Sequence, residues 1–359
     1  MPSSDKPTTA DIADNAYKDE IAAYYDESER DYEIVMQLNH AMALHYGYWD
    51  EGTLTHRQAL WNANYQIARH AQVSATDKVL DAGCGVGGTS FFLAQNLGCR
   101  VHGISLSQKQ IDRALRMREQ LGLEALTEFS CADFTRTPFP DASFDVVIGI
   151  ESILHAPSKE DFLREALRVL KPGGRLIVAD YFCRSPANDE ERITLHKWGK
   201  AWAIRDFING QAFCDQVKQV GFGRVLLSDV SKQAFPSVKL LHRSSYPGVV
   251  ISLINSLFGR RLWGQLRHAR SGRYQYVAFM QGVWRYTYCL AIKSPVPDHA
   301  LTFTGYMRSE PPVARFVDQE SFGSRFPIWS DRRLSVRNLM KRIMHFYLET
   351  GIRNPSRRF

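Results

Sequence analysis

A glycine-rich stretch near the end of the first quarter of the chain carries the clearest chemical signal. Residues 81–90 read DAGCGVGGTS and follow a short apolar run. A turn of this kind between a strand and a helix lets backbone N–H groups approach a ligand, because a Cβ would block both the turn and the approach. Gly83, Gly85 and Gly88 satisfy the G-x-G-x-x-G spacing of dinucleotide sites. The stretch therefore predicts a nucleotide-type ligand at the end of a first strand.

Two features of the surrounding sequence argue against a nicotinamide dinucleotide. The NAD fingerprint requires an acid about 20 residues further on for the ribose hydroxyls, whereas the segment "HGISLS" at 102–107 has no carboxylate. Asp81 lies two residues before Gly83, where it would repel a pyrophosphate and suit a cationic amino group. An NAD-dependent oxidoreductase is therefore disfavoured, and the other use of Asp81 would be to cap a helix.

Three further polar residues lie where strands are expected to end. Glu151 follows the apolar run "VVIGI", where an unpaired carboxylate would be unfavourable, so it is a candidate base or else an ion-pair partner of an arginine. His155, four residues on, is a second candidate for proton transfer or an ordinary loop histidine. Asp133 either binds a ligand or caps the turn that follows it.

Aromatic and arginine residues gather outside the expected sheet. The aromatic side chains lie before it and predict either core packing or a lid against a cationic centre: Tyr24, Tyr25, Tyr46, Tyr48 and Trp49. Arg260 and Arg261 lie in a segment of mixed arginines, aromatics and leucines. Arginine forks suit a phosphate or diphosphate, although a solvated basic helix face gives the same pattern.

Short apolar runs and amphipathic stretches alternate along the middle of the chain, which predicts βα units and a parallel sheet. The expected strands are 78–83, 99–104, 127–133, 144–152, 175–181, 224–231 and 286–294. Helices are expected over 88–97, 107–121 and 159–170, with further helical pattern over 19–72. In such a sheet, ligands bind at the carboxyl ends of the strands.

The organisation beyond the sheet is predicted from composition. We expect a disordered tail over 1–18, one domain over 19–295 with a cap insertion at about 232–285, and a basic extension over 296–359. The cap is placed to cover the site.

Composition and charge narrow the class of protein. The 359 residues carry a net charge of +7, which favours anionic ligands or surfaces, yet no Lys/Arg block or zinc-spaced Cys/His set indicates nucleic-acid binding. The six cysteines are scattered without a C-x-x-C pair, which is typical of reduced thiols and predicts a cytoplasmic protein. The sequence shows neither a signal peptide nor a run of the ~20 apolar residues that a membrane span requires.

Taken together, the motifs carry a family resemblance. "VLDAGCGVGG", "FPDASFDVV" and "LKPGG", in this order, resemble class I S-adenosylmethionine-dependent methyltransferases over roughly residues 20–294. Within that family, "ISLSQKQI", "HYGYWD" and "IESILHAP" are similar to the sterol, tocopherol and geranyl diphosphate C-methyltransferases. The resemblance implies an α/β fold with a Rossmann-like seven-stranded methyltransferase sheet, a helical cap and N-terminal helices.

The resemblance also implies roles for individual residues. Asp81, Gly83 and Gly85 would line the methionine portion of S-adenosyl-L-methionine, Ser105 and Gln110 its ribose, and Asp133 with Phe134 its adenine. Tyr24 would also contact this cofactor. The substrate would contact Tyr25, Tyr46, Tyr48, Trp49, Arg260 and Arg261, and Glu151 and His155 would be catalytic.

The function expected from this set is methylation of a hydrophobic or amphipathic small molecule. C-methylation of an isoprenoid-type acceptor through a carbocation is preferred, with Glu151 as the base and the aromatic cluster holding the cation. The alternatives are O- or N-methylation of an aromatic or indole metabolite, and a non-catalytic membrane- or partner-binding protein. No metal site is predicted, and Mg²⁺ is expected only with a diphosphate substrate. Peripheral membrane contact and a homo-oligomer stay open.

Overall fold

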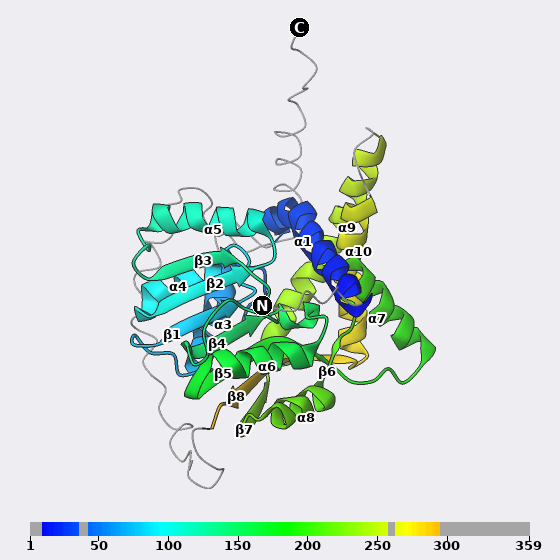
Figure 1. Cartoon of the computed structure of the whole chain (residues 1–359). Coiled ribbons are helices and arrows are strands. Elements are labelled where there is room, and N and C mark those ends of the chain that lie inside the picture. The colour runs from blue at the N-terminus through cyan, green and yellow to red at the C-terminus, as the bar shows by residue number, and fades with distance from the viewer. Residues whose placement is uncertain (1–8, 36–41, 258–262, 295–359) are drawn as a thin grey trace.

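A central sheet carries the elements that position the glycine loop. The computed structural model describes residues 9–35, 42–257 and 263–294, and it contains an eight-stranded sheet of order β3-β2-β1-β4-β5-β8-β7, with β6 beside β5 (Figure 1). The strands are β1 (Lys78–Ala82), β2 (Arg100–Ser105), β3 (Thr127–Cys131), β4 (Phe144–Ile150), β5 (Leu170–Cys183), β6 (Ile208–Asn209), β7 (Arg224–Asp229) and β8 (Trp284–Ile292). Strands β1 to β6 pair in parallel, and β8 runs antiparallel to β5 and β7.

The seven strands expected from the sequence are all present, and the two-residue β6 is the eighth. The parallel strands β1, β2 and β4 are buried over most of their length, as a parallel sheet covered by helices requires. Their carboxyl ends meet at one edge, so residues 81 and 151 come close together although they are distant in sequence.

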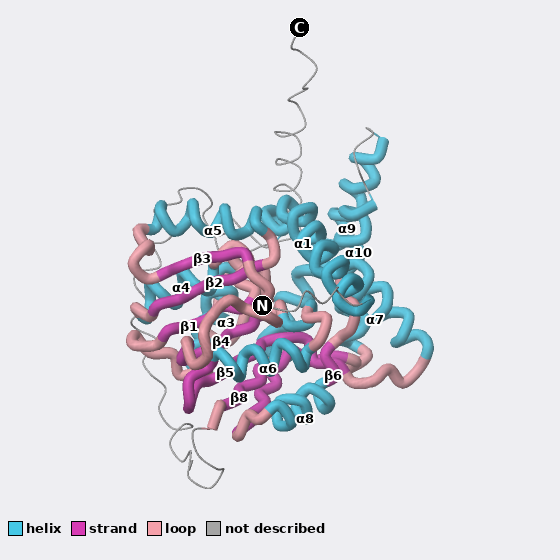
Figure 2. Tube along the Cα trace, viewed as in Figure 1, coloured by secondary structure: helices cyan, strands magenta, loops and turns pink. Residues whose placement is uncertain are grey.

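Helices flank the sheet on both faces (Figure 2). They are α1 (Thr9–Val35), α3 (His56–His70), α4 (Gly88–Leu97), α5 (Gln108–Leu121), η1 (Ile153–His155), α6 (Lys159–Val169), α7 (Asp189–Ala201), α8 (Gly210–Val220), α9 (Ser231–Leu257) and α10 (Trp263–Met280). Helix α6 shows why they pack there. Its apolar residues Phe162, Leu163, Ala166 and Val169 recur at helical spacing and are buried, while its first turn begins at the capping hydroxyl of Ser158.

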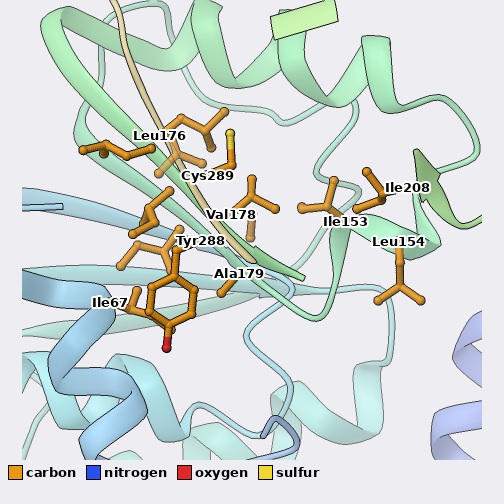
Figure 3. Close-up of a cluster of buried hydrophobic side chains, with 14 of the residues drawn as sticks. Ile67, Ile153, Leu154, Leu176, Val178, Ala179, Ile208, Tyr288 and Cys289 are labelled. Atoms are coloured by element: carbon orange, nitrogen blue, oxygen red, sulfur yellow. The ribbon is translucent and has the colours of Figure 1, made fainter. Parts of the chain in front are cut away.

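The core lies around β5 and β8. Leu176, Val178 and Ala179 of β5 point among side chains from neighbouring elements, including Tyr288 and Cys289 of β8 (Figure 3). Burial of such side chains contributes about 1.5–3 kcal/mol each. The core therefore fixes β5, and with it the loop that follows β4. All six cysteines are free thiols, five of them buried.

The first helix corrects one sequence prediction. A disordered tail was expected over 1–18, but helix α1 begins at Thr9, and the prediction is wrong for residues 9–18. Tyr17 explains the difference, because its ring is 4 % exposed and its hydroxyl donates to the Ala203 carbonyl at 3.0 Å. Tertiary packing thus orders a segment whose own composition is polar.

The insertion in which a cap was expected contains two helices. Helices α9 and α10 occupy the insertion between β7 and β8, pack against each other, and reach α7 through α10 (Figure 1). Gly272 allows the close approach, because a Cβ there would lie 2.5 Å from the Leu241 carbonyl oxygen. Arg260, Arg261 and the extension 296–359 lie outside the described residues. Among the helices that are described, none is long and apolar enough to cross a membrane.

Candidate active site

A cleft opens at the carboxyl ends of β1 and β4, under α1. It encloses about 920 Å³, part of it open to solvent. Most of the predicted cofactor residues and both predicted catalytic residues line it: Asp81, Gly83, Gly85, Ser105, Gln110, Asp133, Phe134, Glu151 and His155. Tyr25 lines it from α1, and residues 42–45 line it from the segment before α3. The structure thus gathers one site from six separate stretches of chain.

The glycine loop forms the floor of the cleft beside β1. Gly83 and Gly85 have φ angles of +91° and +54°, which side-chain-bearing residues rarely adopt. A Cβ on Gly83 would lie 2.4 Å from the Ser152 Cβ. Ser152 in turn donates its hydroxyl to the Ala82 carbonyl at 2.6 Å. Glycine is therefore needed here for both the turn and the contact with the loop after β4.

Asp81 places a buried carboxyl group at the tip of β1. Its Oδ2 accepts a hydrogen bond of 2.6 Å from the Ser90 hydroxyl, and the residue is 2 % exposed. Burial raises the pKa of Asp81 to about 6, against the opposing effect of the Ser90 hydrogen bonds. A cationic ligand would stabilise the ionised form of this buried carboxylate, because its charge offsets the lost solvation.

Ser105 and Gln110 form a linked pair at the end of β2. The Ser105 hydroxyl donates to Gln110 Oε1 at 2.7 Å, and both residues line the cleft. The neighbouring Ser107 caps α5 and donates to Asp26 Oδ1 of α1 at 2.6 Å. The pair predicted for a ribose is therefore close to a point where α1 is fastened to the sheet.

Asp133 is engaged more fully than the sequence suggested. Its Oδ1 accepts from the Thr135 amide at 2.8 Å and from the Thr135 hydroxyl at 2.7 Å, so it caps the turn after β3. Its Oδ2 pairs with Lys18 Nζ of α1 at 2.6 Å. Both readings of Asp133 thus coexist, since a turn-capping residue also lines the cleft.

Glu151 occupies the end of β4 with a φ of +48°. Its carboxyl group accepts from the Tyr46 amide at 2.6 Å, from the Tyr286 hydroxyl at 2.6 Å, and from the Tyr181 hydroxyl. Burial raises the pKa of Glu151 to about 8, and the three hydrogen bonds oppose that rise. The residue is therefore tied into an aromatic cluster. No arginine partner of the kind considered from the sequence appears among its contacts in the described part of the chain.

His155 faces Tyr25 across the cleft. The Tyr25 hydroxyl lies 3.0 Å from His155 Nε2, and His155 Nδ1 lies 3.3 Å from the Ala203 carbonyl oxygen. Because a carbonyl oxygen can only accept, Nδ1 carries the proton and Nε2 presents a lone pair. Burial lowers the pKa of His155 to about 4, so the imidazole is neutral at physiological pH.

The other predicted aromatic residues do not line the cleft. Tyr24 packs edge-on against Tyr25 with ring centroids 5.1 Å apart. Tyr46 is 1 % exposed, and its backbone amide donates to the Glu151 carboxyl group. Trp49 donates its indole N–H to Ser237 of α9 at 3.0 Å, and Tyr48 packs against the core. Tyr46 and Trp49 thus contact the helices α10 and α9. None of the three side chains is among the residues that line the cleft, and their roles as substrate contacts stay predictions.

Sequence reasoning missed several residues that shape the cleft. Lys18 is the last residue of the supposed tail, and no local pattern marks it. His45 and Thr89 also line the cleft, and only the neighbouring motifs HYGYWD and DAGCGVGGTS could have drawn attention to them. Within residues 9–35, 42–257 and 263–294, no group of three or more His, Cys, Asp or Glu is placed to hold a metal ion.

The comparisons with known proteins agree with this geometry. A family model described as "Methyltransferase domain" matches residues 80–178, which include the glycine loop and β4. The chain is 32 % identical over 225 residues to the methyltransferase GfsG of Streptomyces halstedii, covering 62 % of this chain and 80 % of that protein. It is 34 % identical over 198 residues to the 27-O-demethylrifamycin SV methyltransferase of Amycolatopsis mediterranei, covering 54 % and 71 %.

A solved structure extends the agreement to the fold. The geranyl diphosphate methyltransferase in complex with GPP and sinefungin superposes with a TM-score of 0.61 at 18 % identity, covering 77 % of this chain and 99 % of that chain. The sheet and its glycine loop thus have the Rossmann-like methyltransferase fold. With relatives of this identity and coverage, the chain belongs to the S-adenosylmethionine-dependent methyltransferase family.

Proposed function

We propose that this chain transfers the methyl group of S-adenosylmethionine to a hydroxyl group of an amphipathic small molecule, with Tyr25 and His155 removing the proton. The observation that carries the proposal is the 3.0 Å contact between the Tyr25 hydroxyl and the unprotonated Nε2 of His155 inside the cleft. One relative is named for methylation at an oxygen, which supports the same chemistry.

The residues of the cleft fit the methyl donor. Asp81 offers a buried carboxylate for an ammonium group, and the backbone of Gly83 and Gly85 lines the cleft beside it. Ser105 and Gln110 offer polar atoms to a ribose, and the Phe134 ring offers an apolar face to an adenine. S-adenosylmethionine would supply an electrophilic methyl group on a sulfonium, so the protein's tasks are orientation and proton removal.

Proton removal follows from the hydrogen bond between the two side chains. Tyr25 accepts the proton of the substrate hydroxyl while it passes its own proton to His155 Nε2. The new bond joins oxygen to the methyl carbon, and the bond from that carbon to sulfur breaks. The positive charge thus moves from sulfur to the imidazolium. His155 Nδ1 keeps its hydrogen bond to Ala203 throughout, which fixes the orientation of the ring.

C-methylation of an isoprenoid-type acceptor is the second candidate, and Glu151 is the observation that favours it. Its carboxylate, ionised above the pKa of about 8, would be a base for a proton of a carbocation, and the ring of tyrosines would surround that cation. Its carboxyl group already accepts three hydrogen bonds, however, so it is less free than His155 Nε2 to receive a proton. A diphosphate acceptor would bring Mg²⁺ with it and would need cations beyond those described in the cleft.

Incubation with labelled S-adenosylmethionine separates these chemistries. The acceptor panel contains macrolactones with free hydroxyls, prenylated hydroquinones, prenyl diphosphates and indoles, and mass spectrometry locates the added methyl. For an O-methyltransferase, His155→Asn should lower turnover by about 10²–10⁴-fold, while Glu151→Gln keeps most of it. His196→Asn on the exposed face of α7 is the matched control. The reverse order for Glu151→Gln and His155→Asn would instead support C-methylation.

Calorimetry with S-adenosylmethionine separates a wrong acceptor class from the absence of catalysis. If the chain binds S-adenosylmethionine in calorimetry but methylates none of the panel, the acceptor class is wrong. If it binds no donor at all, the non-catalytic alternative, a membrane- or partner-binding protein, takes precedence. The latter outcome would overturn the proposed function.

A further inference from the structure

The side chain of Lys159, the first residue of α6, is directed toward the turn η1 that precedes the helix. Its Nζ donates to the carbonyl oxygens of Leu154 and Ala156, each at 2.8 Å. These two carbonyls flank His155 on either side in sequence. The ammonium group therefore bridges the turn η1 around the residue that carries the imidazole.

Asp180 grips the same turn from β5. Its Oδ2 accepts from the Leu154 amide at 3.0 Å, its Oδ1 accepts from the Tyr181 amide at 2.9 Å, and the residue is fully buried. Leu154 is thus held at its amide by a carboxylate and at its carbonyl by an ammonium. The turn is fixed from two different elements, which leaves the His155 ring little freedom of position.

A buried ammonium is an unfavourable way to satisfy two carbonyls. Lys159 lies at the positive end of the α6 dipole, and burial lowers its pKa to about 8. A neutral amide or hydroxyl could donate the same hydrogen bonds without the loss of solvation. The charge itself therefore requires an explanation.

We propose that Lys159 is a positioning residue for His155: its ammonium group locks the turn that carries the imidazole, and its charge adds to burial in disfavouring protonation of that imidazole. This inference rests on the proposed role of His155 as the proton acceptor. Lys159 would touch neither substrate nor donor, since it does not line the cleft.

The charges around His155 come from every element packed against it. Tyr25 of α1 contacts the His155 ring. Glu151, at the end of β4, is four residues before His155 in the sequence, and Asp180 of β5 accepts from the amide of the adjacent Leu154. Asp180 and Asp206 favour the charged form of Lys159, whereas Arg205 opposes it. Lys18 of α1 also lines the cleft, but its charge is paired with Asp133 at 2.6 Å. Lys159 is a cation that disfavours protonation of His155, after the larger effect of burial.

Two substitutions separate the lock from the charge. Lys159→Met removes both the hydrogen bonds and the charge, whereas Lys159→Gln removes the charge and keeps an N–H donor on a side chain one atom shorter. Lys159→Arg restores a cation. Lys171→Met is the matched control, because Lys171 pairs with Asp145 at the far end of β5.

The first readout is the titration of the His155 ring, followed by NMR in protein without ligands. In wild type we expect a midpoint near pH 4. The midpoint should rise by about one pH unit in Lys159→Met and Lys159→Gln, and stay in place in Lys159→Arg and Lys171→Met. An unchanged midpoint in Lys159→Gln would overturn the proposal, and that variant decides the matter if Lys159→Met fails to fold.

The second readout is the pH dependence of turnover. If Lys159 acts through His155, the acidic limb of the pH profile of turnover should shift to higher pH by the same amount in Lys159→Gln. Turnover of that variant should recover at higher pH, and Lys159→Arg should restore the wild-type profile. A loss that is equal at every pH indicates a structural role only and contradicts the proposal. Failure of the proposed function looks different: His155→Asn would keep full turnover, although the NMR midpoint would still report the effect of Lys159 on the ring.

Discussion

Lowering the pH should weaken binding of the methyl donor through Asp81. The proposed contact needs an ionised carboxylate, and burial raises the pKa of Asp81 to about 6. Protons then compete with the ammonium group of the donor, and the apparent Kd is multiplied by the ratio of total to ionised Asp81. That ratio is about 11 at pH 5 and about 1.1 at pH 7. The effect should therefore be confined to the acidic side of neutrality.

Isothermal titration calorimetry between pH 5 and 8 measures this dependence. In wild type the affinity should fall about tenfold from pH 7 to pH 5, and proton release on binding should grow as the pH falls, passing about half a proton per site near pH 6. Asp81→Asn should bind weakly at every pH, because an amide supplies no charge, and the exposed Asp141→Asn should follow wild type. A flat profile in wild type, or full affinity in Asp81→Asn, would refute the assignment of Asp81 to the ammonium group.

Three further predictions concern packing and assignment. Gly83→Ala should reduce the free energy of unfolding by roughly 1–3 kcal/mol in thermal melts, because φ is +91° and the new Cβ meets Ser152, and it should weaken donor binding as well. An unchanged Tm would contradict this. Trp49→Phe should reduce stability by about 1 kcal/mol through the lost bond to Ser237 while leaving turnover unchanged, and a large loss of turnover would support its substrate role. Trp198→Ala, at a fully buried site, should destabilise the protein by about 3–5 kcal/mol in urea titrations, and a smaller effect would show that the aromatic core can collapse around the gap.

The sequence was informative wherever local pattern decides structure. The seven principal strands and the helices after β1, β2 and β4 lie within a few residues of their expected places, because apolar spacing and turn residues specify them. The glycine loop and Asp81 were found for the same reason. Ser105 and Glu151 could be placed at the ends of strands and Gln110 at the start of a helix, and all three line the cleft.

Other features depended on contacts between distant segments. Tyr25 and His155 are 130 positions apart, and their hydrogen bond could not be read from either neighbourhood. The helix over 9–18 was missed because a polar composition predicts disorder, whereas Tyr17 anchors it on Ala203. The sequence around Trp49 could not decide between core packing and a lid, because an aromatic side chain has the same local signature in a core and in a binding site, whereas its contact with Ser237 needs the fold.

The position of β8 has a consequence for how the protein is made. This strand lies between β5 and β7, although it is the last described element in the chain. Until residues 284–292 have left the ribosome, β5 exposes one edge along most of its length, and β7 has no neighbour to pair with. The domain therefore cannot close during synthesis of its first 280 residues. A chain cut short within β8 should accumulate as an aggregating intermediate, whereas one cut after Ile292 would retain the complete sheet.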